Sequence, residues 1–121
     1  MHIRKNEYDK MSKKLNDSEE VNEIHADLCQ MLSNPTRLQI LNHLKDGEKT
    51  VSELVSKVGV RQANLSQHLA ELRKRNLVEN RKEGANVYYS IAYPEVIEAC
   101  NLMRDVVFKQ LSESKDLVSE D

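Results

Sequence analysis

The sequence predicts a mainly α-helical domain with a small β-hairpin, arranged as a winged helix-turn-helix. Apolar residues recur at helical spacing in five segments, and Lys49-Thr50-Val51 reads as a single short strand between the second and third helices. Gly59 separates the third helix from the fourth, as the turn of a helix-turn-helix requires. Two strand-like runs, 77–82 and 86–91, then flank a glycine-containing turn and predict the hairpin, or wing.

Residues typical of helix ends indicate where the first two helices begin and stop. The first is expected at about 18–33, because Asp17 and Ser18 suit a helix cap and acidic residues follow in the first turn. Asn34 is expected to cap the second helix, with Pro35 at its first position. The turn signal Asp46-Gly47 ends that helix.

The later helices define the centre of the domain. Ser52 and Glu53 are expected to cap the third helix. The fourth helix is expected at about 62–75, with leucines 65, 69 and 72 on one face. The last helix is expected from Pro94 to about Ser112, and its apolar stripe is broad enough for two burial partners.

Length and composition indicate one folded domain at 18–112, between a flexible charged arm at 1–17 and an acidic tail at 113–121. A chain of 121 residues with one Phe and no Trp has few large side chains for a core, and such small protomers often complete their burial by dimerising. No run approaches the roughly 18 apolar residues of a membrane span. The polar N-terminus and two cysteines favour a cytoplasmic location without membrane contact.

Charge is distributed unevenly along the chain. Residues 35–90 hold ten Lys or Arg against six Asp or Glu, a net charge of +4, whereas the flanks carry −6 and bring the whole chain to −2. Salt screens the interaction between charges that are more than a Debye length of about 10 Å apart, so the basic centre can attract nucleic acid despite the acidic flanks.

The fourth helix is the candidate reader of DNA bases. With its leucines turned inward, the outward residues of its first two turns are Gln62, Ala63, Ser66 and Gln67. Gln and Ser can hydrogen-bond base edges in the major groove. Basic residues at helix starts and ends and on the hairpin are candidates for the DNA backbone: Arg37, Arg61, Arg73, Lys74, Arg81 and Lys82. A merely solvated polar face is the alternative, and the glycine turn and basic hairpin favour readout.

Three segments, 32–41, 64–72 and 77–90, resemble the DNA-binding core of ArsR/SmtB-type repressors, within a similarity that covers about 20–112. The resemblance implies a winged-helix homodimer, paired through its first and last helices, that binds a two-fold operator on double-stranded DNA. It also implies repression that an unidentified signal releases. In that family the positions of the four outward residues meet base edges, and the wing contacts the flanking backbone.

Arg61 departs from the family, which commonly has Ser at the start of the recognition helix. Arg cannot cap a helix and is unfavourable at the positive end of its dipole, so we expect a loss of about 1 kcal/mol of stability. A contact between Arg61 and a phosphate or a guanine would compensate.

A sensor is not evident from the sequence. The last helix has no His for the family's carboxylate-and-histidine metal site, 53–56 lacks the Cys-x-Cys of another site, and Asn42 replaces the first cysteine of the persulfide-sensing branch. His25, Cys29 and Cys100 remain as a candidate site for a soft ion such as Zn, Cu(I) or As(III), or as a dithiol switch. No metal site is assigned, because Cys100 lies within an apolar stripe where packing is the stronger interpretation.

Other classes of function have less support. No phosphate-binding glycine loop, nucleophile elbow or catalytic triad is present, so the sequence predicts no enzyme. A winged-helix module that binds proteins rather than DNA is the alternative. Such a module would more often expose apolar residues where this chain has Gln62, Ser66 and Gln67.

Overall fold

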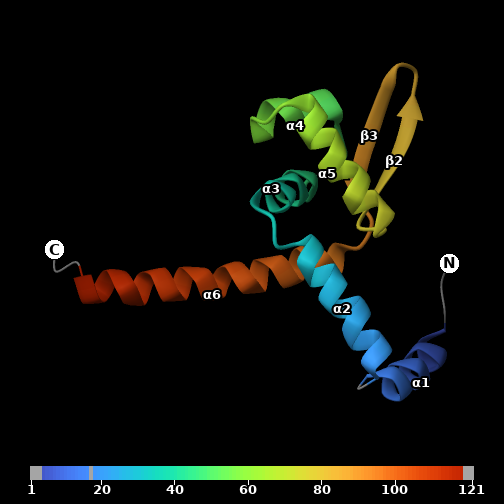
Figure 1. Cartoon of the computed structure of the whole chain (residues 1–121), viewed down its shortest axis with the longest axis vertical. Coiled ribbons are helices and arrows are strands. Elements are labelled where there is room, and N and C mark those ends of the chain that lie inside the picture. The colour runs from blue at the N-terminus through green and yellow to red at the C-terminus, as the bar shows by residue number, and fades with distance from the viewer. Residues whose placement is uncertain (1–3, 17, 119–121) are drawn as a thin grey trace.

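The computed structural model describes residues 4–16 and 18–118, with side chains as far as residue 114. The elements in chain order are α1 (Lys5–Leu15), α2 (Glu19–Met31), α3 (Pro35–Leu44), β1 (Lys49–Thr50), α4 (Val51–Val58), α5 (Gln62–Lys74), β2 (Val78–Glu83), β3 (Asn86–Ile91) and α6 (Pro94–Val118). Helices α3, α4 and α5 pack with the hairpin into one unit, from which α2 and α6 extend in different directions (Figure 1).

The predicted winged helix-turn-helix is confirmed, and the local signals that define it are visible. Asn34 caps α3 by accepting a hydrogen bond from the Arg37 amide at 3.1 Å. Gly59 ends α4 in the left-handed conformation, with φ at +79°, which a side chain would disfavour. Only three residues, 59–61, therefore separate α4 from the recognition helix α5, which gives the short turn of the motif.

The sheet has the order β1-β3-β2 and is antiparallel throughout. Strands β2 and β3 pair from Val78↔Ile91 to Glu83↔Asn86, which leaves Gly84 and Ala85 as a tight turn at the tip. Gly84 has φ at +62°, the backbone conformation that a two-residue hairpin turn needs at its first position. The short strand expected at 49–51 is present as Lys49–Thr50, and it anchors the wing by pairing with β3.

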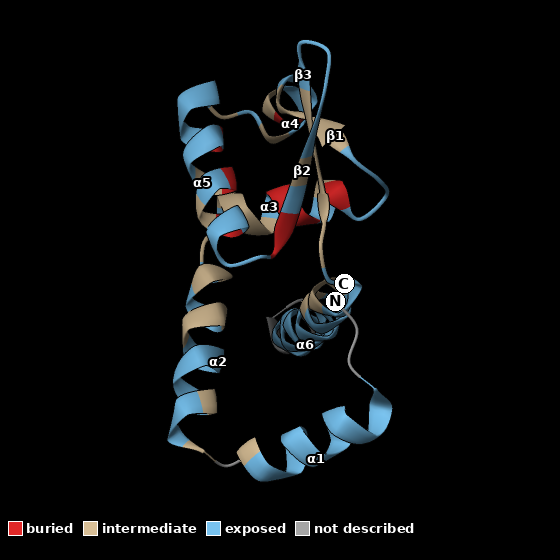
Figure 2. Cartoon of the chain, turned by 90° about the vertical axis from the view of Figure 1, so that its right-hand side faces the viewer, coloured by how far each residue is buried: buried red, intermediate tan, exposed pale blue. Residues whose placement is uncertain are grey.

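The core is small and wholly aliphatic. It lies between α3, α4, α5 and the first residues of the hairpin (Figure 2). Its buried members are Ile40, Leu41, Leu44, Leu54, Leu65, Leu69, Leu72, Leu77 and Val78. Burying each such side chain contributes about 1.5–3 kcal/mol, so the leucine faces of α3 and α5 hold the domain together.

Two of the expectations about helix ends need correction. Helix α4 is capped by Thr50, not by Ser52: the Thr50 hydroxyl accepts from the Glu53 amide and the Glu53 carboxylate accepts from the Thr50 amide. Ser18 does cap α2, with its hydroxyl 3.1 Å from the Val21 amide, whereas Asp17 lies outside the described residues. Helix α6 does not end near Ser112 but continues to Val118, because no Gly or Pro follows to stop it.

The charged arm also differs from expectation, because it contains helix α1. Glu7 lies in its first turn and Lys13 and Lys14 in its last, an order that suits the helix dipole. Tyr8, Met11 and Leu15 fall on one side of it at i, i+3 and i+7. No residue of α1 is buried, and the arm predicted to be flexible is helical from Lys5 to Leu15.

Two polar contacts fix the helices around the core. Arg37 on α3 donates from Nε to Nδ1 of His68 on α5 at 3.1 Å, and its Nη1 lies 3.2 Å from the Met31 sulfur. His68 is half-buried and accepts this hydrogen bond from Arg37. An ion pair of 2.6 Å between Arg75 and Asp27 joins the end of α5 to α2.

We expect the Arg37–His68 contact to make stability depend on pH. Burial lowers the pKa of His68 below its ordinary value of 6.5, and the charge of Arg37 lowers it further. The folded state therefore binds fewer protons than the unfolded state, and this contribution is present above pH 6.5 and lost as the pH falls through the folded-state pKa. His68→Gln keeps an acceptor for Arg37 but cannot titrate, so it should lose less stability on acidification than the wild type.

The measurement is urea unfolding at about pH 7.5 and about pH 5.5, with His25→Gln as the control because His25 is exposed. Equal losses of stability in the wild type and in His68→Gln would contradict the role of this contact.

Candidate nucleic-acid interface

Helix α5 presents a polar face because its leucines are anchored in the core. Leu65, Leu69 and Leu72 have no exposed surface, which fixes the rotation of the helix about its axis. The four residues predicted to contact bases, Gln62, Ala63, Ser66 and Gln67, are all exposed. Asn64 is exposed beside them and was not included in the prediction, although Asn side chains can also bond adenine edges.

The N-terminus of α5 and the tip of the wing lie at the same end of the molecule, away from α6 (Figures 1 and 2). A helix that enters the major groove leads with its N-terminal residues, and a wing at the same end can reach the adjacent backbone. The fold therefore brings the start of α5, which carries the predicted base-contacting residues, and the hairpin tip to one end of the molecule.

Arg61 occupies the N-cap position of α5 and makes no side-chain cap, as the sequence predicts. Its side chain is exposed at the open, positive end of the helix dipole. Uncapped backbone amides and a guanidinium at one helix start are well suited to binding a phosphate.

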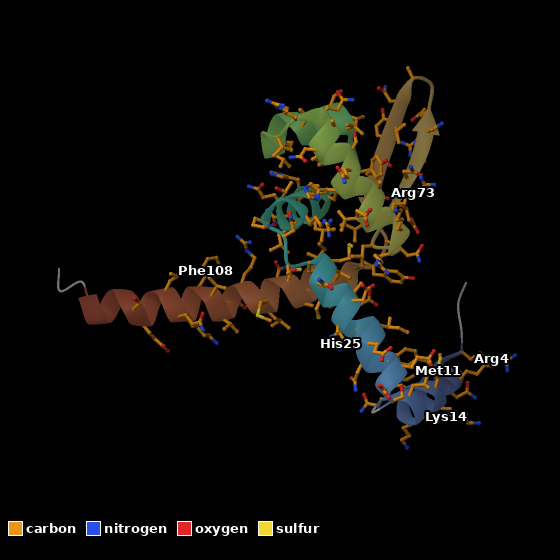
Figure 3. All side chains as sticks on the ribbon, in the orientation of Figure 1. Arg4, Met11, Lys14, His25, Arg73 and Phe108 are labelled. Atoms are coloured by element: carbon orange, nitrogen blue, oxygen red, sulfur yellow. The ribbon has the colours of Figure 1, made fainter. Side chains whose placement is uncertain are left out.

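Arg73 and Lys74 lie at the other end of α5. Arg73 is placed near the base of the hairpin, far from the wing tip (Figure 3). Lys74 pairs with Glu71 at 3.4 Å on the helix surface. Both side chains are exposed, and their contact with the DNA backbone remains a prediction.

Two other predicted backbone contacts also have partners inside the protein. Arg37 is half-buried and bonded to His68, so little of its guanidinium faces outward. Arg81 binds Glu48 through two bonds, from Nε at 3.0 Å and from Nη2 at 2.5 Å, and Glu83 through Nη1 at 2.8 Å. The guanidinium carbon of Arg81 also lies 4.5 Å from the centre of the Tyr88 ring.

These bonds make Arg81 a brace between the wing and the loop before β1. The hydrogen bonds from Arg81 lower the pKa of Glu48, and the two carboxylates raise the pKa of Arg81, so Glu48 and Arg81 both stay charged near neutral pH. Two carboxylates offset the single charge of Arg81, whereas Lys82, its exposed neighbour on β2, has no ion pair among the described residues. Lys82 is therefore the better candidate of the two for a phosphate.

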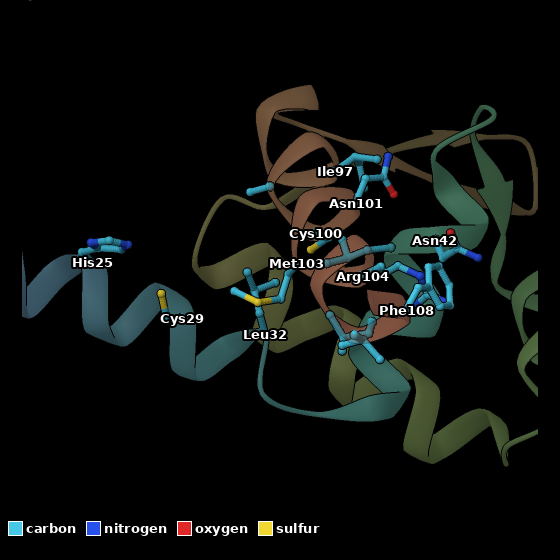
Figure 4. A pocket seen from close by; sticks show the side chains of 14 residues that line it. His25, Cys29, Leu32, Asn42, Ile97, Cys100, Asn101, Met103, Arg104 and Phe108 are labelled. Atoms are coloured by element: carbon cyan, nitrogen blue, oxygen red, sulfur yellow. The ribbon is translucent and has the colours of Figure 1, made fainter. Parts of the chain in front are cut away.

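The candidate sensor residues line one cavity of about 540 Å³ between α2, α3 and α6. His25 and Cys29 project from α2 and Cys100 from α6 (Figure 4). Both thiols are free, and partial burial raises the pKa of Cys100, which disfavours its thiolate. Within residues 4–16 and 18–118, no three His, Cys, Asp or Glu side chains are grouped closely enough to hold a metal ion.

No helix in the described part of the chain is both long and apolar enough to cross a membrane.

A winged helix-turn-helix with an exposed polar recognition helix defines a class of DNA-binding regulators. The family model described as "Bacterial regulatory protein, arsR family" matches residues 34–80. The HTH-type transcriptional regulator Rv0081 of Mycobacterium tuberculosis is 36% identical over 98 residues, which span 80% of this chain and 86% of that protein. Its crystal structure superposes with a TM-score of 0.72 and covers 80% of this chain and 98% of its own.

Two further relatives agree. The biofilm growth-associated repressor of Xylella fastidiosa is 32% identical over 85 residues, covering 70% of this chain and 75% of that protein. The homodimeric winged helix-turn-helix DNA-binding domain Mb0332 of Mycobacterium bovis is 32% identical, with a TM-score of 0.69 and coverage of 77% and 86%. The chain belongs to the arsR family of bacterial regulatory proteins. It is a transcriptional regulator and not an enzyme.

Replacing Arg61 by Ser tests the missing cap. Arg61→Ser should stabilise the free protein by about 1 kcal/mol, because a Ser hydroxyl can accept from an amide of the first turn. The same change should weaken DNA binding, because it removes a cation from the start of α5. Thermal unfolding and fluorescence anisotropy with a labelled duplex measure the two effects, and unchanged DNA affinity would exclude the contact.

Arg81 and Lys82, which are neighbours on β2, provide a matched pair of variants that tests how the wing contacts DNA. Lys82→Ala should reduce the slope of log K against log salt by about 0.9, the effect of losing one phosphate contact. Arg81→Ala should change that slope much less, because Glu48 and Glu83 already offset its charge. Anisotropy titrations across a range of salt concentrations measure both, and a drop as large for Arg81→Ala as for Lys82→Ala would show that Arg81 reaches DNA directly.

Proposed function

We propose that the protein is a homodimeric repressor that reads a two-fold DNA operator with α5 in the major groove. The proposal rests on one observation: the start of α5 and the tip of the wing lie at the same end of the molecule (Figure 2). At that end the residues assigned to base edges are Gln62, Ala63, Ser66 and Gln67, with Asn64 added, and those assigned to the backbone are Arg61 and Lys82. Arg37 and Arg81 are bonded to other residues of the protein, so we assign them to holding the DNA-binding elements in place rather than to contacting DNA.

Exposed apolar side chains support the homodimer. Leu102, Met103 and Phe108 on α6 are 68%, 65% and 56% exposed, which is unusual for residues of this kind in a monomer. The broad apolar stripe predicted for α6 therefore packs on its own domain through Val96 and Ile97. Its other apolar residues are left exposed. The related Mb0332 domain is homodimeric, and the related Xylella protein is a repressor.

The polar character of α5 favours DNA over a protein partner. The exposed residues of its first turns are Gln, Ala, Asn and Ser, without a large apolar side chain among them. The centres of protein interfaces are enriched in aromatic residues and Met instead.

Selection from a pool of duplexes with a randomised centre tests the proposal. We expect enrichment of a two-fold sequence whose half-sites are about 10–10.5 bp apart, centre to centre, or a multiple of that distance. Affinity for the selected duplex should fall steeply with salt, because bound counterions are released. Gln67→Ala should lose about 1–3 kcal/mol of discrimination at one base pair per half-site.

Gln30→Ala is the matched control, since Gln30 is exposed on α2 and away from α5. The absence of any enriched sequence, or binding that does not respond to salt, would favour the protein-interaction module. A reporter downstream of the selected sequence determines the direction of control: lower expression supports repression, and higher expression would reassign the protein as an activator.

A further inference from the structure

Helix α1 carries an apolar stripe that the chain itself leaves largely uncovered. Tyr8 and Met11 are 57% and 44% exposed, and Leu15 is half-buried. With Val21 at the start of α2, they line a concave corner of about 200 Å³ between the two helices. An isolated helix of 11 residues is marginal in water, so α1 needs an apolar partner to be stable.

Helix α6 carries apolar side chains that also lack a partner. Beyond the part that packs on the core, residues 101–114 are all exposed. Six large apolar residues on this part are 44–68% exposed: Leu102, Met103, Val106, Val107, Phe108 and Leu111. The last two belong to the C-terminal half of α6. That half points away from the domain (Figure 1).

The arrangement of α1, α2 and α6 suggests what covers both surfaces. Helix α2 leads down from the core, and α1 turns at its lower end to run beneath the axis of α6 (Figure 2). Helix α6 starts beside α2 and leads away from α1 (Figure 1). In a dimer whose two-fold axis is perpendicular to α6, the α6 of the second copy runs antiparallel, and its C-terminal half comes back toward α2 and α1.

The charges of the two segments are complementary. Residues 4–16 contain five Lys or Arg against two acids, a net charge of +3. Residues 105–121 contain two Lys against five acids, a net charge of −3. Opposite charges at the rim of an apolar contact favour one pairing over others and speed association.

We propose that α1 is a clasp that closes over a second copy of this chain. The stripe of Tyr8, Met11 and Leu15 packs on the C-terminal half of α6 of the second copy, at Phe108 and Leu111. The proposal rests on the homodimer proposed above and adds to it a contact made by the N-terminal helix. The clasp gives α1 the apolar partner that its own chain does not supply.

Truncating the stripe tests the clasp. Tyr8→Ala with Met11→Ala should raise the dimer dissociation constant about a hundredfold, because each dimer loses two copies of both side chains. Asn6→Ala with Lys13→Ala is the control, since these residues lie on the opposite side of α1 and exposed lysines contribute little at physiological salt. Sedimentation velocity over a range of concentrations measures both. Unfolding by urea should show an intact core, because α1 contributes no buried residue.

Disulfide trapping tests the geometry. One tagged copy carries Met11→Cys and a second, differently tagged copy carries Leu111→Cys, both with Cys29→Ser and Cys100→Ser. We expect a disulfide between the two tagged chains, and none when Lys13→Cys replaces Met11→Cys.

The possible failures are distinguishable. A wild-type chain that stays monomeric at every concentration would overturn the homodimer, and the clasp with it. A wild-type dimer whose dissociation constant is unaffected by the stripe variant, without trapping between chains, would overturn the clasp alone. Trapping in Lys13→Cys as readily as in Met11→Cys would likewise overturn it.

Discussion

The packing of the α5 leucines is the constraint on which the rest of the structure depends. Leu65, Leu69 and Leu72 are fully buried against α3, α4 and the start of the hairpin, and together they permit only one rotation of α5 about its axis. That rotation decides which side chains face solvent. A rotation of one residue position would bury Ser66 and expose a leucine, at a cost of several kcal/mol. The polar surface that α5 presents to solvent is thus a consequence of how the core is filled.

The parts of the fold that could be predicted are those whose cause lies within a few residues. Asn34 followed by Pro35, Gly59 at a helix end, and leucines at i, i+4 and i+7 each determine local structure by themselves, and the structure contains all of them. The cap of α4 was misplaced by two residues because Thr50 and Ser52 both have the hydroxyl that a cap needs. Only the reciprocal bond with Glu53 selects Thr50.

The site was less predictable, because the partners of a charged side chain are chosen by the folded chain. Arg81 is 33 residues from Glu48, and Arg37 is 31 residues from His68, so neither contact leaves a pattern in the sequence. Both residues were expected to contact phosphates because of their charge and their places at a helix start and on the hairpin. Helix α1 was missed for a related reason: its three apolar residues are outnumbered by charges, and no local signal says what they would pack against.

The aliphatic core has a consequence for how the protein can be observed. The chain has no Trp, and its four tyrosines lie at Tyr8 on α1, at Tyr88 and Tyr89 on β3, and at Tyr93 before α6. None of the four is among the buried core residues. Ultraviolet fluorescence of the unlabelled protein therefore reports the wing and the helices outside the core. The emission of Tyr88, beside the guanidinium of Arg81, is a local probe of the wing.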